Sequence, residues 1–178
     1  MNFRTTAIDG VVEIDTEVRR DERGSFARAF CAEEMAAHGI AFSVVQANLS
    51  SNAARGTLRG MHYQAEPVPD PKIVRCVRGR VFDVALDLRR GSPTLHRWTA
   101  VELDAERRNA VHIPAGCAHG FLTLSDDCEL FYLMGAPYVA ELARGVRWDD
   151  PVFAIEWPEA PRIVAPRDAT FPYQNETG

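Results

Sequence analysis

Hydrophobic and polar positions alternate over short stretches along most of the chain. Alternation of this kind, bounded by Gly, Pro, Asn, Asp or Ser, is typical of strands that bury one face. The stretches are 11–18, 42–49, 56–64, 72–88, 97–103, 109–114, 119–124 and 128–134. Within 72–88, the segment Val77–Val81 has a glycine near its centre and predicts a hairpin turn. Many short strands at this spacing predict an all-β sandwich or barrel.

A single segment has the character of a helix. Residues 32–38 carry acidic side chains in the first turn, and Gly39 is placed to end the helix. The prolines at 67, 69 and 71 indicate a stiff loop rather than a domain boundary, because strand-like sequence resumes at Lys72. Without repeats or linker-like composition, residues 1–178 are expected to form one domain.

Composition and charge narrow the class of protein. The 178 residues are 46% hydrophobic and 25% charged, as in ordinary globular proteins. The net charge of −5 argues against a protein that coats nucleic acid or an anionic membrane. The longest apolar-leaning stretch, 130–140, is shorter than the roughly 20 residues of a membrane span. The start of the chain does not resemble a signal peptide, and its four cysteines lack metal-ligand spacing. We therefore expect reduced thiols and a cytoplasmic location.

Two histidines stand in sequence contexts that suggest a site. His119 follows a Pro-x-Gly turn in IPAGCAHGF, which resembles the second signature of cupin jelly rolls, and His62 lies in RGMHYQ. Metal-binding cupins carry His-x-His at the latter place, but the second position here is Gln64, and no matching Glu follows. Two histidines are too few for a divalent site, which needs three or four good ligands. The sequence thus predicts a cupin without a metal, whose histidines are candidates for acid–base chemistry.

Seven segments, in order and in spacing, resemble the dTDP-4-dehydrorhamnose 3,5-epimerase family. They are RGMHYQ, KIVRC, VFDVALDLRRGSPT, IPAGCAHGF, LFYL, IEWP and PRDATFP, and the resemblance runs from about residue 7 to 172. It implies a cupin-type jelly roll, a double-stranded β-sandwich with one or two short helices. It also implies an enzyme without metal or cofactor that acts on nucleoside-diphosphate 4-keto-6-deoxy sugars. Such enzymes are usually homodimers that exchange N-terminal strands, with no nucleic-acid or membrane partner.

The resemblance implies four catalytic residues. His62 matches the base, and Asp168 matches the carboxylate that orients it. Tyr132 matches the proton donor on the opposite face of the sugar, and Lys72 a cation near the sugar carbonyl. These types suit epimerisation next to a ketone, which needs a base, an acid and a group that stabilises the enolate. Without the family context, Asp168 would be interpreted as a surface turn residue and Tyr132 as a core aromatic.

The resemblance also implies a set of substrate-binding residues. Arg23 and Arg59 match contacts to phosphate or sugar, and His119 matches a hydrogen-bonding residue of the site. Gln46 and Asn48 match polar contacts, and Tyr138 matches the aromatic that stacks on the nucleobase. Strand alternation places Arg59 and His62 on opposite faces, so we expect a bulge or twist at Gly60.

The chain departs from the family at Arg28 and Ala143, where relatives commonly carry Glu. Both positions fall among the nucleotide and rim contacts, so the reaction type is better determined than the nucleotide. A GDP- or CDP-linked sugar and a mono-epimerase acting at C3 or C5 alone stay open. A non-catalytic sugar-binding cupin and a metal-dependent cupin isomerase or oxygenase are the alternatives from other classes.

Overall fold

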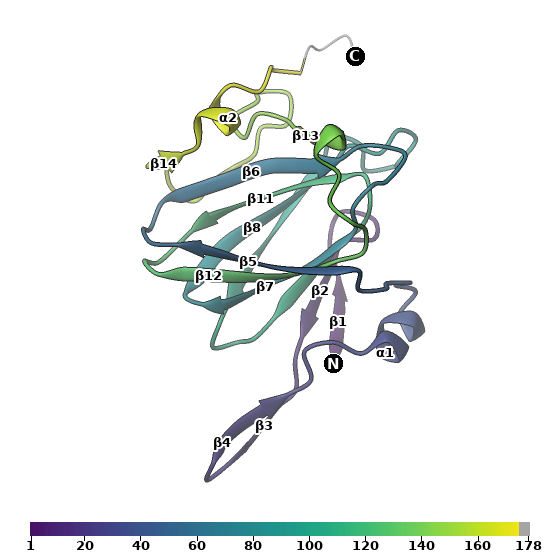
Figure 1. Cartoon of the computed structure of the whole chain (residues 1–178), viewed down its shortest axis with the longest axis vertical. Coiled ribbons are helices and arrows are strands. Elements are labelled where there is room, and N and C mark those ends of the chain that lie inside the picture. Colours follow the sequence, from purple (N-terminus) through teal and green to yellow (C-terminus); the bar gives the residue numbers. More distant parts are fainter. Residues whose placement is uncertain (175–178) are drawn as a thin grey trace.

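The computed structural model describes residues 1–174 and consists mainly of two facing β-sheets (Figure 1). The first sheet has the order β1-β2-β10-β7-β12-β5. Its strands are β1 (Asn2–Thr5), β2 (Val12–Asp15), β10 (Ala110–Ile113), β7 (Lys72–Arg78), β12 (Cys128–Met134) and β5 (Gln46–Asn52). All of its neighbours run antiparallel.

The second sheet has the order β13-β6-β11-β8-β9, and β14 pairs with β6 in parallel. Its strands are β13 (Ala143–Gly145), β6 (Thr57–Gln64), β11 (Cys117–Thr123), β8 (Arg80–Asp87), β9 (Trp98–Asp104) and β14 (Ile163–Val164). The all-β prediction is confirmed, and most predicted strands are present with shifted ends. Residues 42–45 are not in a strand: Phe42 packs with Ile40 and Met35 instead, while Val44 and Val45 are exposed.

The predicted hairpin at residues 77–81 is wrong. Gly79 does connect β7 to β8, but β7 pairs with β10 and β12 whereas β8 pairs with β9 and β11. The connection is a corner between the two sheets. It places Val81 and Ala85 of β8 in the core between the sheets, where they meet Val74 and Leu130 of the first sheet. Val84 and Leu86 lie on the opposite face of β8, which Val146 and Phe153 cover.

Two short helices, a 3₁₀ turn and a two-stranded hairpin lie outside the sandwich. The helix α1 (Ala32–Ala37) ends one residue before the predicted end. A second short helix agrees with the one or two expected, but its place, α2 (Pro166–Ala169), was not predicted. A 3₁₀ turn, η1 (Ala140–Leu142), precedes β13. The strands β3 (Val18–Asp21) and β4 (Gly24–Ala27) form a hairpin that extends away from the sandwich (Figure 1). No helix in residues 1–174 is long and apolar enough to cross a membrane.

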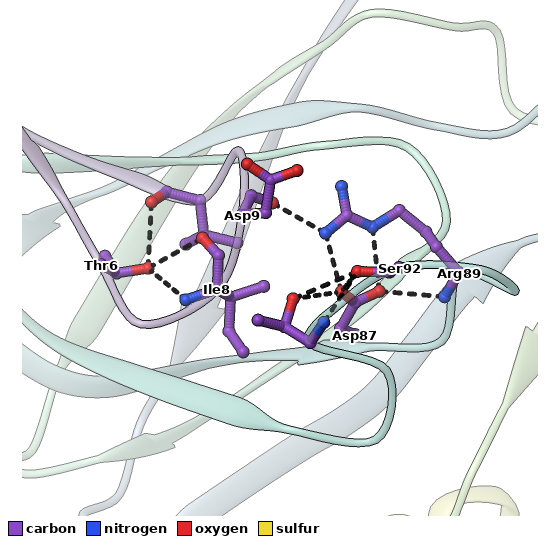
Figure 2. Close-up of polar contacts among 8 residues, drawn as sticks. Thr6, Ile8, Asp9, Asp87, Arg89 and Ser92 are labelled. Carbon is purple, nitrogen blue, oxygen red and sulfur yellow. Dashed lines mark hydrogen bonds and ion pairs between the residues drawn. The ribbon is translucent and has the colours of Figure 1, made fainter.

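A buried carboxylate holds an arginine that links the β8–β9 connection to the β1–β2 connection (Figure 2). Asp87 is fully buried and accepts hydrogen bonds from the Arg89 guanidinium and from the hydroxyls of Ser92 and Thr94. Arg89 also donates to the carbonyl oxygen of Asp9, at 2.7 Å. The N-terminal strands are therefore held against their own chain by this contact as well as by the pairing of β2 with β10.

Candidate active site

A pocket of about 380 Å³ opens between the two sheets. Strands β5, β7 and β12 of the first sheet line it on one side, β6 and β11 of the second on the other, and α2 closes part of it. Of the ten predicted site residues, seven line this pocket: Asn48, Arg59, His62, Lys72, His119, Tyr132 and Asp168. Leu49, Ser50, Phe121, Met134, Ala165 and Arg167 complete the lining.

The side chains of His62 and Asp168 contact each other at the pocket wall. Nε2 of His62 lies 2.7 Å from Oδ1 of Asp168, and the backbone N–H of Gly60 donates to Oδ2 at 3.1 Å. Asp168 is 3% exposed, so it is not the surface residue that its turn-like sequence suggests. Burial raises the pKa of Asp168, but the hydrogen bonds from His62 and Gly60 outweigh it, and the net pKa is lowered. An ionised Asp168 fixes the His62 proton on Nε2, which leaves Nδ1 free to accept another.

The irregularity predicted in the His62 strand is confirmed. The register between β6 and β11 shifts between the pairs His119–His62 and Phe121–Arg59. Gly60 lies at this point with φ +143°, and a Cβ there would meet Cα of Gly120 at 2.5 Å. The shift explains how Arg59 and His62, three residues apart, both line the pocket.

A second histidine–aspartate pair joins the pocket residue His119 to the buried Asp83. Nε2 of His119 is 2.8 Å from Oδ2 of Asp83, and both side chains are almost completely buried. The His119 ring stands edge-on to Tyr132, with centroids 5.9 Å apart. Burial raises the pKa of the Tyr132 phenol, and the nearby Asp83 carboxylate raises it further. Asp83 was not predicted as a site residue, although it is an acidic residue within an apolar strand, and that was the signal available.

Two further cationic side chains of the pocket, Lys72 and Arg59, are held by neighbouring polar groups. Lys72 is buried, and its Nζ lies 2.8 Å from Oδ2 of Asp70. Arg59 donates from Nε to Oδ1 of Asn52 at 2.7 Å, which fixes its guanidinium. Among residues 1–174, no group of three or more His, Cys, Asp or Glu side chains lies close enough together to hold a metal ion. All four cysteines are free thiols.

Three predicted residues do not line the pocket. Gln46 and Tyr138 lie beside it, since Gln46 hydrogen-bonds to the pocket residue Asn48 and to the backbone of Tyr138. Arg23 lies at the far end of the β3–β4 hairpin, which extends away from the sandwich, and it pairs with Asp21 (Figure 1). No contact within this chain brings Arg23 to the pocket in the described residues 1–174.

The two positions that depart from the family lie in different surroundings. Arg28 pairs with Glu34, which also binds the amino group of Met1 at 2.8 Å. Ala143 begins β13 and pairs with Gln64 at the end of the His62 strand. Arg28 is therefore engaged near α1, whereas Ala143 lies next to the Tyr138 loop.

Comparison with known proteins shows which family the chain resembles. The family model described as dTDP-4-dehydrorhamnose 3,5-epimerase matches residues 5–176. A relative of that name from Sinorhizobium fredii is 40% identical over 173 residues, which is 97% of this chain and 89% of the relative. A dTDP-4-dehydrorhamnose 3-epimerase from Streptomyces niveus is 42% identical over 94% of this chain and 81% of its own length. The crystal structure of the Bacillus anthracis 3,5-epimerase with TDP and PPi bound superposes with a TM-score of 0.93 at 31% identity, covering 97% of this chain and 99% of that one.

The fold and the comparisons define an isomerase built on a jelly-roll sandwich, as the sequence predicted. The chain belongs to the dTDP-4-dehydrorhamnose 3,5-epimerase family.

Proposed function

We propose that this chain inverts C3 and C5 of a dTDP-linked 4-keto-6-deoxyhexose by removing and returning protons next to the ketone. The observation that carries the proposal is the placement of the His62–Asp168 pair, Lys72 and Tyr132 around one pocket. These are the base, the cation and the acid that the reaction needs, and family membership supplies the substrate class.

The reaction proceeds through an enolate. Nδ1 of His62 takes the proton from the carbon next to the ketone, and the electrons of the broken C–H bond move onto the carbonyl oxygen. The imidazolium is stabilised by Asp168, and Lys72 offsets charge on the enolate oxygen. Tyr132 then donates its phenolic proton to the opposite face of the same carbon, and the charge on the oxygen collapses back to the ketone. Proton return from His62 to Tyr132 through solvent restores both groups before the second carbon reacts.

The test is hydrogen exchange in D₂O with dTDP-4-keto-6-deoxyglucose. NMR should detect deuterium at C3 and C5, and His62→Asn should lower the rate by about 10²–10⁴-fold, the usual contribution of a general base. His96→Asn is the control, because His96 does not line the pocket. Undiminished exchange in His62→Asn would reject the proposed base. Binding of the sugar nucleotide without any exchange would indicate a non-catalytic sugar-binding protein.

A mono-epimerase is the second candidate, because the Streptomyces niveus relative is named as a 3-epimerase. Deuterium at C3 but not at C5 would assign this activity. A GDP- or CDP-linked substrate is tested by thermal shift with dTDP, GDP and CDP, since the ligand that binds the native state most tightly stabilises it most. We expect the largest shift with dTDP.

The proposal includes a homodimer in which the β3–β4 hairpin contacts the partner. Phe26 on this hairpin is 74% exposed, Arg23 stands at its turn, and the hairpin extends away from the sandwich (Figure 1). In this proposal the partner covers Phe26 and receives Arg23 near its own pocket. Light scattering should give the mass of a dimer, and Phe26→Glu should give a monomer. A wild-type monomer would reject this part of the proposal.

We also propose a cytoplasmic location for the enzyme. Four free thiols support this location, because oxidising compartments favour disulfides. Imaging of a fluorescent fusion tests it, and an extracytoplasmic signal would contradict it.

A further inference from the structure

Gln64 hydrogen-bonds two loops at the end of the His62 strand. It is 4% exposed and ends β6. Its Nε2 donates to the carbonyl oxygens of Val68 at 2.5 Å and Pro137 at 3.0 Å, and its Oε1 accepts from the backbone N–H of Val139 at 2.8 Å. Both amide hydrogens and the carbonyl oxygen are thereby used.

A second glutamine binds the residue between these two backbone contacts. Oε1 of Gln46 accepts from the N–H of Tyr138 at 3.3 Å, while its Nε2 donates to Oδ1 of Asn48 at 2.9 Å. Three consecutive residues, 137 to 139, are therefore held by side-chain amides from β5 and β6. Asn48 lines the pocket, so this chain of hydrogen bonds connects the Tyr138 loop to the pocket wall.

The residue that this arrangement presents is an exposed aromatic. The Tyr138 side chain is 63% exposed, although its backbone is fixed on both sides. An aromatic ring on a fixed backbone loses little freedom when a planar group stacks on it, and such preorganisation improves affinity. In a sugar-nucleotide enzyme, the planar group of the substrate is the nucleobase.

We propose that Gln64 is a positioning residue for the nucleobase: it acts on substrate binding by holding the 137–139 loop so that Tyr138 is presented for stacking. This rests on the proposed function, because that function supplies the nucleotide. Gln64 has no contact with the reacting atoms in this proposal. Its loss therefore raises KM and the Kd for the nucleotide, rather than lowering kcat.

A double-mutant cycle tests the proposal with dTDP alone. Gln64→Leu keeps a similar volume but removes all three hydrogen bonds, and Tyr138→Ala removes the ring. Titration calorimetry should show that Gln64→Leu raises the dTDP Kd by about tenfold in the wild-type background. In the Tyr138→Ala background the same change should have an effect below about twofold, because residues that act through one another are not additive.

Two outcomes would overturn the proposal. An unchanged dTDP Kd in Gln64→Leu, with Tyr138→Ala weakened, would show that the loop needs no such support. Equal effects in both backgrounds would show a general structural role unrelated to Tyr138. Gln174→Leu is the matched control, because its side chain makes no hydrogen bond with the residues that the structure describes. The expected double-mutant result for the dTDP Kd, in a protein that exchanges no deuterium into the sugar, would support this inference and reject the epimerase proposal.

Gln64→Glu serves if Gln64→Leu does not fold. An ionised carboxylate would face the carbonyl oxygens of Val68 and Pro137 without a hydrogen to donate, whereas the protonated form donates one. The ratio of the variant's dTDP Kd to the wild-type Kd should therefore be smaller at pH 5 than at pH 8. A Kd ratio that does not change with pH would contradict the proposed contacts.

Discussion

His62 of β6 and His119 of β11 are paired in register across the two strands, and Nε2 of each contacts the carboxylate of a different aspartate. The pairs differ in exposure: the His62 side chain is 42% exposed, whereas that of His119 is 7% exposed. Both imidazoles line the pocket, and the more exposed one is the one paired with Asp168.

Replacement of Asp168 by Asn should lower kcat with little change in nucleotide affinity. The amide keeps the size of the side chain but removes the charge that stabilises the His62 imidazolium and fixes its tautomer. We expect a loss of about 10²–10⁴-fold in steady-state turnover. Asp149→Asn is the control, because Asp149 pairs with Arg147 outside the pocket. Full turnover in Asp168→Asn would contradict the role assigned to the carboxylate.

Replacement of Tyr132 by Phe should separate proton removal from inversion. The ring stays, so packing against the core is kept, but the donor for the opposite face is lost. Deuterium should still enter from the His62 side, while formation of the inverted sugar falls by about 10²–10⁴-fold. Chiral product analysis beside exchange measurements makes the distinction. Equal loss of both would show that Tyr132 is needed for the first step.

The phenol of Tyr132 should lose its proton only at high pH. Burial raises its pKa above the usual value of about 10, so the phenol stays protonated to higher pH than an exposed tyrosine. In a phenolate absorbance titration of the folded protein, the Tyr132 phenol should resist ionisation well above pH 10. This resistant fraction should be missing in Tyr132→Phe. An identical titration in both proteins would contradict the assignment.

Asp87→Asn should destabilise the fold in a pH-dependent way. Burial raises the pKa of Asp87, but the bonds from Arg89, Ser92 and Thr94 outweigh this and lower it well below its usual range. A lowered native pKa means that the contribution is complete above the unfolded pKa of about 3.9 and is lost as pH falls below it. We expect a loss of about 2–3 kcal/mol in the free energy of unfolding at pH 7.

Urea unfolding at pH 7 and pH 3 measures this difference. The gap between wild type and Asp87→Asn should narrow at pH 3. Asp9→Asn is the control, because Asp9 joins the network through its backbone carbonyl oxygen (Figure 2). A gap that widens at pH 3 would contradict the sign of the shift.

Gly60→Ala should disturb the site more than an ordinary glycine replacement. The added Cβ would meet Cα of Gly120 at 2.5 Å, where neither strand can yield easily. Gly39→Ala is a matched control, since Gly39 also has positive φ but no atom within 4 Å of the added Cβ. Thermal unfolding should show the larger loss for Gly60→Ala, with loss of activity. Equal Tm losses would show that close packing against Gly120 is unimportant.

Local sequence pattern predicted the strands but not how they pair. Alternation located β6, β7, β8 and β12, because each strand buries at least one face wherever it lies. It could not show that Gly79 turns a corner between sheets, since the preference for a tight turn is the same in both cases.

The site was predicted to the extent that residues could be matched to a known family. His62, Lys72, Tyr132 and Asp168 meet in one pocket although they come from four separate elements. Asp83 was missed because its partner His119 lies 36 positions away and only the pairing of β8 with β11 brings them together. The roles of all ten site residues stay predictions, and Arg23, Gln46 and Tyr138 do not line the pocket.

The last part of the chain covers the outer face of β8 with Phe153 and then returns to the pocket through α2 with Asp168. A nascent polypeptide that stopped after β13 would possess every imidazole and the phenol of the pocket, yet no carboxylate beside His62. If Asp168 orients His62 as proposed, turnover requires this C-terminal segment, and removal of residues 146–174 would also take β14 away from β6.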